Sequence, residues 1–252
     1  MVFLKKEIRE YYRTGRLFVF GIAALLLGLM NPAVAKLTPR LLETMADSLK
    51  ESGMSVAVKE ADAFACWQQY YKNLPMLLII IMIILAGSFA KEYSHNTLLL
   101  VVTKGYSRRN IYLAKALMMF AVYTLASLVY FGITYFYSGF YWDNSIVSNI
   151  FAAAAVYWLF GILIIAMILF FSSFINEATG IMAATGIFVM FYYLLAIIPK
   201  LKKYLPVKLT ESQALLTKSA EIGDFTAAII ATLVVSAGLF AAGYVMFGKK
   251  KL

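Results

Sequence analysis

The run PMLLIIIMIILAGSFA, residues 75–90, contains no charged side chain, and it leads directly into the polar segment KEYSHNTLLLVVTKGYSRRNIYLAK, residues 91–115. Five more apolar runs occupy residues 17–35, 111–137, 150–171, 178–198 and 225–247. About 20 apolar residues are enough for a helix to cross the hydrocarbon core of a bilayer. The sequence therefore predicts an all-α polytopic membrane protein, with six transmembrane helices in a single domain over residues 1–252.

The composition supports this class. Of the 252 residues, 62% are hydrophobic and only 14% are charged, whereas about a quarter of a soluble domain is charged. In a membrane protein the net charge of +10 is interpreted by side of the membrane, so it does not indicate a nucleic-acid partner. Cys66 is the only cysteine, which excludes an intramolecular disulfide and leaves a buried apolar filler or a disulfide between two copies.

Residues 3–16 have the pattern of an amphipathic helix that lies on the membrane surface. Leu4, Ile8, Tyr11 and Tyr12 share its apolar face, and Lys5, Arg9, Arg13 and Arg16 share the adjoining basic face. A simpler interpretation is a positive anchor for the first span. Ala33-Val34-Ala35 resembles a signal-peptidase site, but cleavage there would leave an odd number of spans, so we expect the span to be retained.

The segments between the spans differ in length. Residues 36–73 are predicted to be a polar loop with a short surface helix at 38–52, and residues 199–224 are predicted to be a second polar loop. A tight turn is expected at 172–177, and the aromatic sequence YFYSGFYW at 135–142 marks a membrane–water boundary.

Basic residues set the predicted orientation. Lys5, Lys6, Arg9, Arg13 and Arg16 all precede the first span. Cytoplasmic flanks carry an excess of Lys and Arg, and the first span usually dominates. With six spans, both termini are therefore expected in the cytoplasm. We expect the protein to reside in the cytoplasmic membrane of a bacterium.

The sequence offers no recognisable catalytic, metal or nucleotide site. The span cores lack ionisable residues, which argues against an ion-coupled pump, and a His-Glu-x-x-His metalloprotease motif is absent because His95 is the only histidine. Residues 243–250, GYVMFGKK, fit most of a phosphate-binding P-loop, but a lysine replaces the final Ser/Thr and no strand precedes them. The chain is therefore not expected to be an enzyme or to bind a cofactor itself.

The segment 91–115 is the most conspicuous polar feature. Residues 92–103 are predicted to form a helix, Gly105 its left-handed cap, and Ser107 the N-cap of the next helix. Arg108 and Arg109 then lie in a first turn, where positive charge opposes the helix dipole. Anionic lipid headgroups or an acidic protein partner would each compensate for this cost.

These residues resemble the signature of the ABC-2 type permeases, the membrane subunits of ATP-binding-cassette exporters. The matching positions are Glu92, Asn96-Thr97-Leu98, Thr103-Lys104-Gly105, Ser107-Arg108, Ile111 and Lys115. The family pattern has glycine where Asn96 stands, which is a mild departure because asparagine tolerates similar backbone geometry. The basic surface helix and the six spans also match, so the resemblance covers the whole chain.

The resemblance implies a function. The chain would be the permease subunit of an exporter, with the 91–110 segment seated as a coupling helix on a separate cytoplasmic ABC ATPase that binds ATP and magnesium. A second permease copy would complete the transport path, as a homodimer or a pair of related permeases. The implied ATPase-coupling residues are Glu92, Asn96, Thr97, Lys104, Gly105, Ser107, Arg108 and Arg109. We expect Glu92 to pair with a nearby cation.

The fifth span carries mildly polar and soft residues suited to an apolar or amphipathic cargo, such as a peptide antibiotic, a drug or a lipid-like compound. These are Thr179, Met182, Thr185, Met190, Tyr192 and Tyr193. Core packing is the alternative interpretation for them. Gly180/Ala184 and Gly238/Ala242 permit close helix contacts, either within the chain or between copies. The alternative function is a non-transport scaffold or sensor that docks a cytoplasmic partner through residues 91–115.

Overall fold

The computed structural model describes residues 2–50, 60–94, 102–103 and 105–250. Within these residues it is all-helical, and six helices are long and apolar enough to cross a membrane. The elements, in chain order, are α1 (Val2–Arg13), α2 (Arg16–Lys50), α3 (Ala63–Ser94), α5 (Arg108–Tyr141), η1 (Asn144–Ile146), α6 (Ile150–Ser172), α7 (Ala178–Leu195), α8 (Pro199–Lys202), η2 (Pro206–Thr217), η3 (Ile222–Phe225) and α9 (Thr226–Lys249). The predicted fold class is confirmed.

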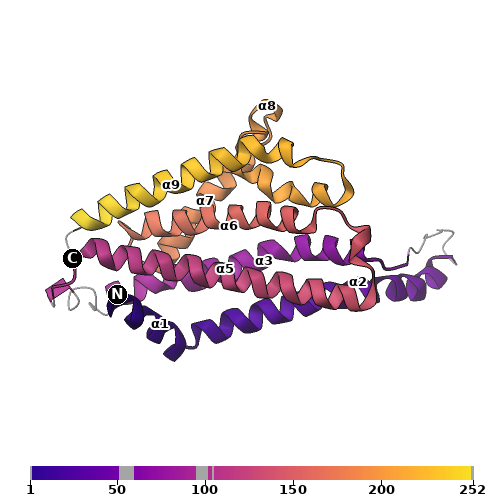
Figure 1. Ribbon diagram of the computed structural model, residues 1–252, viewed down its shortest axis with the longest axis horizontal. Helices are drawn as coiled ribbons and strands as arrows, with labels where there is room; N and C mark the ends of the chain where they lie inside the picture. Colours follow the sequence, from indigo (N-terminus) through magenta and orange to yellow (C-terminus); the bar gives the residue numbers. More distant parts are fainter. Residues whose placement is uncertain (1, 51–59, 95–101, 104, 251–252) are drawn as a thin grey trace.

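The long helices run side by side, and both ends of the chain lie at the same end of the bundle (Figure 1). We call this the inner end, and the opposite one the outer end. α6 is the most buried of the six helices and packs against α3, α5, α7 and α9. α7 is the most exposed, with contacts mainly to α3 and α6.

The first transmembrane helix is much longer than residues 17–35. α2 has 35 residues, about 50 Å at 1.5 Å per residue, and it projects beyond its neighbours at the outer end (Figure 1). The loop predicted to start at residue 36 is therefore wrong over its first part, because the helix continues through Pro32 and Pro39. The predicted surface helix is the outer part of α2, and residues 51 and 52 lie outside the described part.

Pro32 is accommodated by a neighbouring helix. A proline has no N–H for the carbonyl four residues earlier, which here belongs to Gly28. The hydroxyl of Thr134 on α5 donates a hydrogen bond to that carbonyl at 3.3 Å. Such replacement donors allow proline inside membrane helices. The sequence could not show it, because the donor is supplied by a distant segment.

The second transmembrane helix also starts earlier than expected, at Ala63 rather than residue 75. The Asp62 carboxylate accepts a hydrogen bond from the Ala65 N–H at 2.7 Å, which caps the helix start. Trp67, Cys66 and Tyr70 are buried on its inward face. The burial of Cys66 favours the interpretation as an apolar filler over a disulfide between copies.

A buried polar network joins α2, α3 and α5. The Asn31 amide donates to Tyr130 Oη at 3.0 Å and to Thr134 Oγ1 at 2.9 Å, and its carbonyl oxygen accepts from Asn73 Nδ2 at 2.7 Å. Tyr130 in turn donates to the Tyr70 carbonyl at 2.8 Å. Asn31 is fully buried, so these bonds fix how the three helices align.

Replacing Asn31 with leucine is expected to destabilise the protein by about 2 kcal/mol, since each interhelical hydrogen bond in a membrane contributes roughly 0.6 kcal/mol and Asn31 makes three. The measurement is unfolding by denaturing detergent. A double-mutant cycle with Thr134→Val should show a coupling energy. Additive effects of the two substitutions would contradict the network.

Two glycines let α5 approach its neighbours closely. A Cβ on Gly161 of α6 would lie 2.0 Å from Tyr123 Oη, and a Cβ on Gly243 of α9 would lie 2.3 Å from Tyr112 Oη. Both tyrosines are buried. Gly243 begins the P-loop-like sequence, but its residues continue as helix α9 to Lys249. The glycine therefore serves helix packing, and the rejection of a P-loop agrees with this geometry.

The region 199–224 is more ordered than the predicted loop. η2 packs across the outer ends of α6 and α9 and buries Val207, Leu209, Leu215 and Leu216. On its surface, Glu211 pairs with Lys202 and Lys208, and these lysines hold the pKa of that carboxyl below its usual value. The segment therefore covers the outer parts of α6 and α9.

Candidate functional site

The N-terminal helix α1 lies against the inner end of the bundle through one narrow face. Phe3, Glu7 and Tyr11 recur at helical spacing and are all buried. Ile8 and Tyr12 remain exposed, as expected for side chains directed toward lipid. The interfacial helix is therefore supported, with two differences: Tyr11 belongs to the protein-facing side, and the helix ends at Arg13 before a turn at Gly15, which has a φ of +70°.

Glu7, Glu92 and Lys115 form a buried ion-pair cluster that joins three helices. Lys115 Nζ of α5 lies 3.2 Å from a Glu7 carboxylate oxygen of α1 and 3.1 Å from Glu92 Oε2 of α3. The side chains of Glu7, Glu92 and Lys115 are 1%, 4% and 0% exposed. Buried charges of this kind are retained only when paired, so each member depends on the others.

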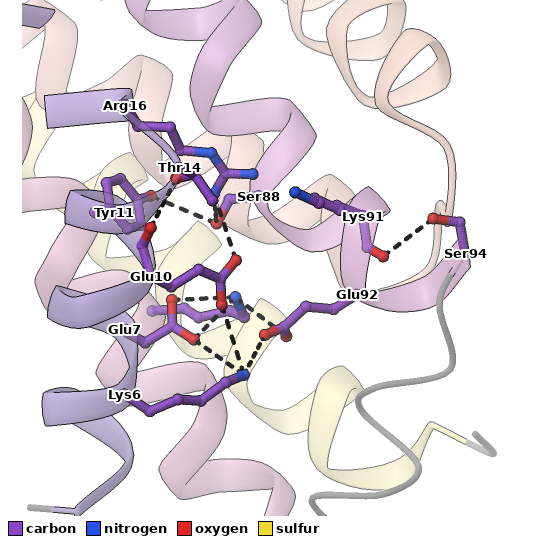
Figure 2. Close-up of polar contacts among 11 residues, drawn as sticks. Lys6, Glu7, Glu10, Tyr11, Thr14, Arg16, Ser88, Lys91, Glu92 and Ser94 are labelled. Atoms are coloured by element: carbon purple, nitrogen blue, oxygen red, sulfur yellow. Dashed lines mark hydrogen bonds and ion pairs between the residues drawn. The ribbon is translucent and has the colours of Figure 1, made fainter. Parts of the chain in front are cut away.

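Further charges surround this core. Lys6 donates to Glu92 Oε1 at 2.7 Å and lies 3.7 Å from Glu10 Oε2, and Arg16 lies 3.9 Å from Glu10 Oε1. Figure 2 shows the side chains of Lys6, Glu7, Glu10 and Glu92 pointing toward one another from α1 and α3. Arg16 and Tyr11 both donate to Ser88 Oγ of α3, at 3.3 and 3.4 Å. We call these eight residues (Lys6, Glu7, Glu10, Tyr11, Arg16, Ser88, Glu92 and Lys115) the inner cluster.

The inner cluster is electrically balanced. Three carboxylates, from Glu7, Glu10 and Glu92, lie within 4.8 Å of one another, a separation that would suit a metal ion. However, the ammonium groups of Lys6 and Lys115 already contact them. With Arg16, which lies near Glu10, three cations match the three carboxylates. The geometry is therefore that of an ion-pair network that holds α1 against α3 and α5.

Burial raises the pKa of Glu7 above its usual value of 4.5, and the nearby carboxylates of Glu92 and Glu10 act in the same direction, while Lys115 and Lys6 oppose it. At Glu7 the folded protein therefore binds more protons than the unfolded chain does, at pH values from 4.5 up to the raised pKa. The contribution of Glu7 to stability accordingly decreases as pH rises through this window.

Glu7→Gln resembles the protonated carboxyl and should remove that dependence. We expect the stability of the Glu7→Gln variant relative to wild type to increase as pH rises from about 4.5 to 7. Thermal unfolding of both proteins across this range measures it. A difference that shrinks with rising pH would contradict the assigned direction of the pKa.

The described part of the polar segment has the predicted backbone. Gly105 has a φ of +87°, and its N–H donates to the Val102 carbonyl at 3.0 Å. Ser107 is the N-cap of α5, with its side chain accepting from the Asn110 N–H. Both predictions are confirmed. His95, Asn96, Thr97 and Lys104, and most of the predicted helix 92–103, lie outside the described residues; residues 92–94 continue α3.

Arg108 and Arg109 lie in the first turn of α5, as predicted, and both contact the end of α9. Arg108 donates to the main-chain carbonyl of Lys250, and the Arg109 guanidinium lies 5.5 Å from the Tyr244 ring centre. The last carbonyls of a helix carry partial negative charge. Arg108 opposes the dipole of α5 but complements the dipole of α9. The positive charge at the start of α5 is therefore compensated within the chain, which the sequence did not reveal.

The side chain of Lys250 lies across the inner end and contacts Asn176 and Tyr93. Its ammonium donates to Asn176 Oδ1 at 2.6 Å and lies 3.9 Å from the Tyr93 ring centre. Burial lowers the pKa of Lys250 to about 8. Lys250 therefore contributes contacts as well as positive charge.

The proposed path residues on α7 do not share one surface within the chain. Thr185 is buried and donates to the Ile181 carbonyl of its own helix at 2.8 Å. Met190 and Tyr193 are exposed, as is Thr179, while Met182 and Tyr192 are half-buried. A path along α7 therefore remains a prediction that requires a second copy. Gly238 and Ala242 are likewise exposed on α9, whereas Gly180 packs against Ile175.

The sequence indicated Glu92 but not Glu7 and Lys6, which lie beside it. It also did not indicate Ser88, which accepts hydrogen bonds from Tyr11 and Arg16. Glu92 pairs with two cations, as expected. A signal for Glu7 was present, since it lies between Phe3 and Tyr11 at four-residue spacing on an apolar stripe. Lys115, five positions inside the third apolar run, was a second signal for a buried partner.

Comparison with known proteins identifies the family. The family described as "Protein of unknown function (DUF2705)" matches residues 52–249. The chain belongs to this family. It is also 23% identical, over 235 residues, to the "uncharacterized transmembrane protein YxlG" of Bacillus subtilis (strain 168), with 89% of this chain and 87% of the relative covered. This similarity and the six apolar helices indicate a multi-pass transmembrane protein.

Proposed function

We propose that this protein is the membrane-spanning permease subunit of an ATP-driven exporter, with ATP hydrolysed by a separate cytoplasmic ABC ATPase. The observation that carries the proposal is the position of Lys115. It is fully buried and pairs with Glu7 and Glu92, so it ties together both flanks of the polar segment and the surface helix α1. The resemblance of this segment to the ABC-2 signature supports the same function.

This arrangement suits the transmission of force. A partner that pushes on the segment between α3 and α5 moves two transmembrane helices at once, because Glu92 in the last turn of α3 pairs with Lys115, which lies two turns inside α5. α1 is held to both by Glu7 and Lys6. The transmembrane helices form the path for the cargo, and the partner supplies energy by hydrolysing ATP.

The rest of the assembly follows from this function. An apolar or amphipathic cargo fits spans whose charged groups are concentrated at the ends. Only 11% and 22% of the residues in the most apolar stretches of α7 and α9 are buried, which leaves room for a second permease copy. Export from a bacterial cytoplasmic membrane is the direction that the resemblance implies.

Association with the ATPase tests the proposal. The ABC ATPase encoded beside this chain's gene should co-purify with the wild-type protein, and Glu92→Ala or Arg108→Glu should uncouple ATP hydrolysis from transport. Glu211→Gln is the matched control, because Glu211 forms its ion pairs with Lys202 and Lys208 at the outer end. We expect it to leave coupling unchanged.

The outcomes separate the two functions. Loss of coupling in the Glu92 variant, with intact membrane insertion and retained ATPase, supports a permease. If no ATPase associates, and deletion changes neither export nor drug tolerance, the permease reading fails. A scaffold or sensor that uses the same surface then becomes the better account.

A further inference from the structure

The segment that follows α7 carries an unusual charge for its side of the membrane. Residues 196–209, AIIPKLKKYLPVKL, contain four lysines and no acidic residue. The next acidic residue, Glu211, already pairs with both Lys202 and Lys208. Membrane proteins concentrate Lys and Arg on the cytoplasmic side, whereas α7 carries these lysines to the outer side. An anionic partner there would compensate for their charge.

Residues 197–204 present a basic face and an apolar face side by side. Main-chain hydrogen bonds continue the helical turns from the end of α7 through α8 as far as Leu205. Lys200 and Lys203, three positions apart, are exposed on one side of these turns. The apolar side chains share the adjoining side and are exposed as well: Ile197, Ile198, Leu201 and Tyr204. This pattern is typical of a segment that lies at a membrane surface.

The length of α7 places these residues at the membrane boundary. α7 has 18 residues, about 27 Å at 1.5 Å per residue, and the hydrocarbon core is about 30 Å thick. Since α7 starts at the inner turn, residues 197–204 lie where the core meets the headgroups on the outer side. In Figure 1 α8 lies at the margin of the bundle, set back from the outer tip of α2. The apolar side chains therefore contact hydrocarbon, and the lysines extend to the phosphate level.

Lys200 and Lys203 differ from their neighbours in lacking a carboxylate partner. Within the described part of the chain neither of them forms an ion pair, and the ammonium of Lys203 lies 4.8 Å from the Tyr204 ring centre. Lys202 and Lys208, by contrast, are both held by Glu211. The two uncompensated ammonium groups are thus the pair that an outside anion can reach.

We propose that Lys200 and Lys203 bind the phosphate of an anionic phospholipid in the outer-side leaflet, with its acyl chains against Ile197, Ile198 and Leu201. The apolar face favours a lipid over a water-soluble polyanion, because a lipid supplies hydrocarbon and phosphate at the same place. α7 is the least buried of the membrane-spanning helices in the described part, so this lipid anchors its outer end. The inference does not depend on the proposed export function, because neither an ATPase nor a cargo is involved.

Photo-crosslinking with two lipid probes tests the site. Both probes carry a diazirine in the same acyl chain, and they differ only in the headgroup, phosphatidylglycerol or phosphatidylcholine. The protein is reconstituted in phosphatidylcholine nanodiscs with one probe, and adducts in residues 196–205 are quantified by peptide mass spectrometry. Phosphatidylglycerol should give about five- to thirty-fold more adducts, since each lysine near the surface raises the affinity for anionic lipid about five-fold.

Two double variants of equal charge separate this site from the general charge of the outer side. Lys200→Gln combined with Lys203→Gln should remove the preference for phosphatidylglycerol. Arg40→Gln combined with Lys218→Gln is the matched control, because these two side chains are also exposed but lie on α2 and after η2. It should leave the preference unchanged. All four side chains are exposed, so both variants are expected to fold.

Three outcomes would overturn the proposal. The first is equal labelling by the two probes, or a preference that persists without Lys200 and Lys203. The second is an absence of adducts with either probe, because residues 197–204 would then lie in water. The third concerns a soluble polyanion: phosphatidylglycerol should protect Lys200 and Lys203 from amine acetylation, and inorganic polyphosphate added to phosphatidylcholine nanodiscs should not. The reverse result would assign the site to a soluble polyanion.

Discussion

Lys115→Met is expected to reduce the free energy of unfolding by about 3–5 kcal/mol, the largest effect of any single substitution at the inner cluster. The reason is the burial of its partners. Glu7 and Glu92 are 1% and 4% exposed, so removing the ammonium leaves two carboxylates out of water without their central cation. Unfolding in denaturing detergent measures the change.

Lys208→Met is the matched control. Lys208 also pairs with a glutamate, at 2.9 Å, but its side chain is 23% exposed and that of Glu211 is 40% exposed. A solvated pair contributes about 0–1 kcal/mol, so this variant should remain near wild-type stability. Equal losses in the two lysine variants would contradict the special role of burial.

A second substitution distinguishes charge from packing. Glu7→Gln added to Lys115→Met removes one of the two uncompensated carboxylates, and it should recover part of the lost stability. If the double variant is less stable than Lys115→Met alone, the loss arises from side-chain packing and the ion-pair explanation is wrong.

Gly161→Ala is expected to destabilise the protein by about 2–3 kcal/mol, although alanine forms helix better than glycine by about 1 kcal/mol. The added Cβ would lie 2.0 Å from Tyr123 Oη and 2.9 Å from Leu78 Cδ2. Since Tyr123 is buried, it cannot move aside, and α5 and α6 must separate. Thermal unfolding measures the effect.

Gly87→Ala provides the comparison for this prediction. Gly87 lies inside α3, and a Cβ there would meet nothing within 4 Å. Helix propensity alone then acts, so this variant should be as stable as wild type or up to about 1 kcal/mol more stable. A loss of stability similar to that of Gly161→Ala would contradict the steric explanation for Gly161.

The contrast between these glycines shows what the sequence could and could not predict. The apolar runs, the cap at Gly105 and the N-cap at Ser107 were predictable because each depends on nearby residues. Gly161 and Gly243 are the glycines against which tyrosines of α5 pack. Their positions depend on how α5 crosses α6 and α9, which no local sequence pattern encodes. The hydrogen bond that Thr134 donates near Pro32 was not predictable for the same reason, because Thr134 lies on a different helix.

The inner cluster was only half predictable. Glu92 was expected to find a cation, and it does. Its partner Lys6 is 86 residues away in the sequence and meets it because α1 lies against the inner end of α3. Its partner Lys115, at the other end of the polar segment, meets it because α3 and α5 lie side by side. The sequence suggested that Arg108 and Arg109 bind lipid headgroups or a protein partner. In the structure Arg108 donates a hydrogen bond to a carbonyl of the chain itself.

The most direct test of the proposed function is a crosslink from the polar segment to the ATPase. A photo-crosslinking amino acid at Thr103, which is exposed, should form an adduct with the ABC ATPase encoded beside this chain, and Glu92→Ala should weaken it. The same probe at Lys218, exposed at the outer end, should form none. An ATPase adduct absent from Thr103 in intact membranes, or equally strong from both positions, would contradict the account.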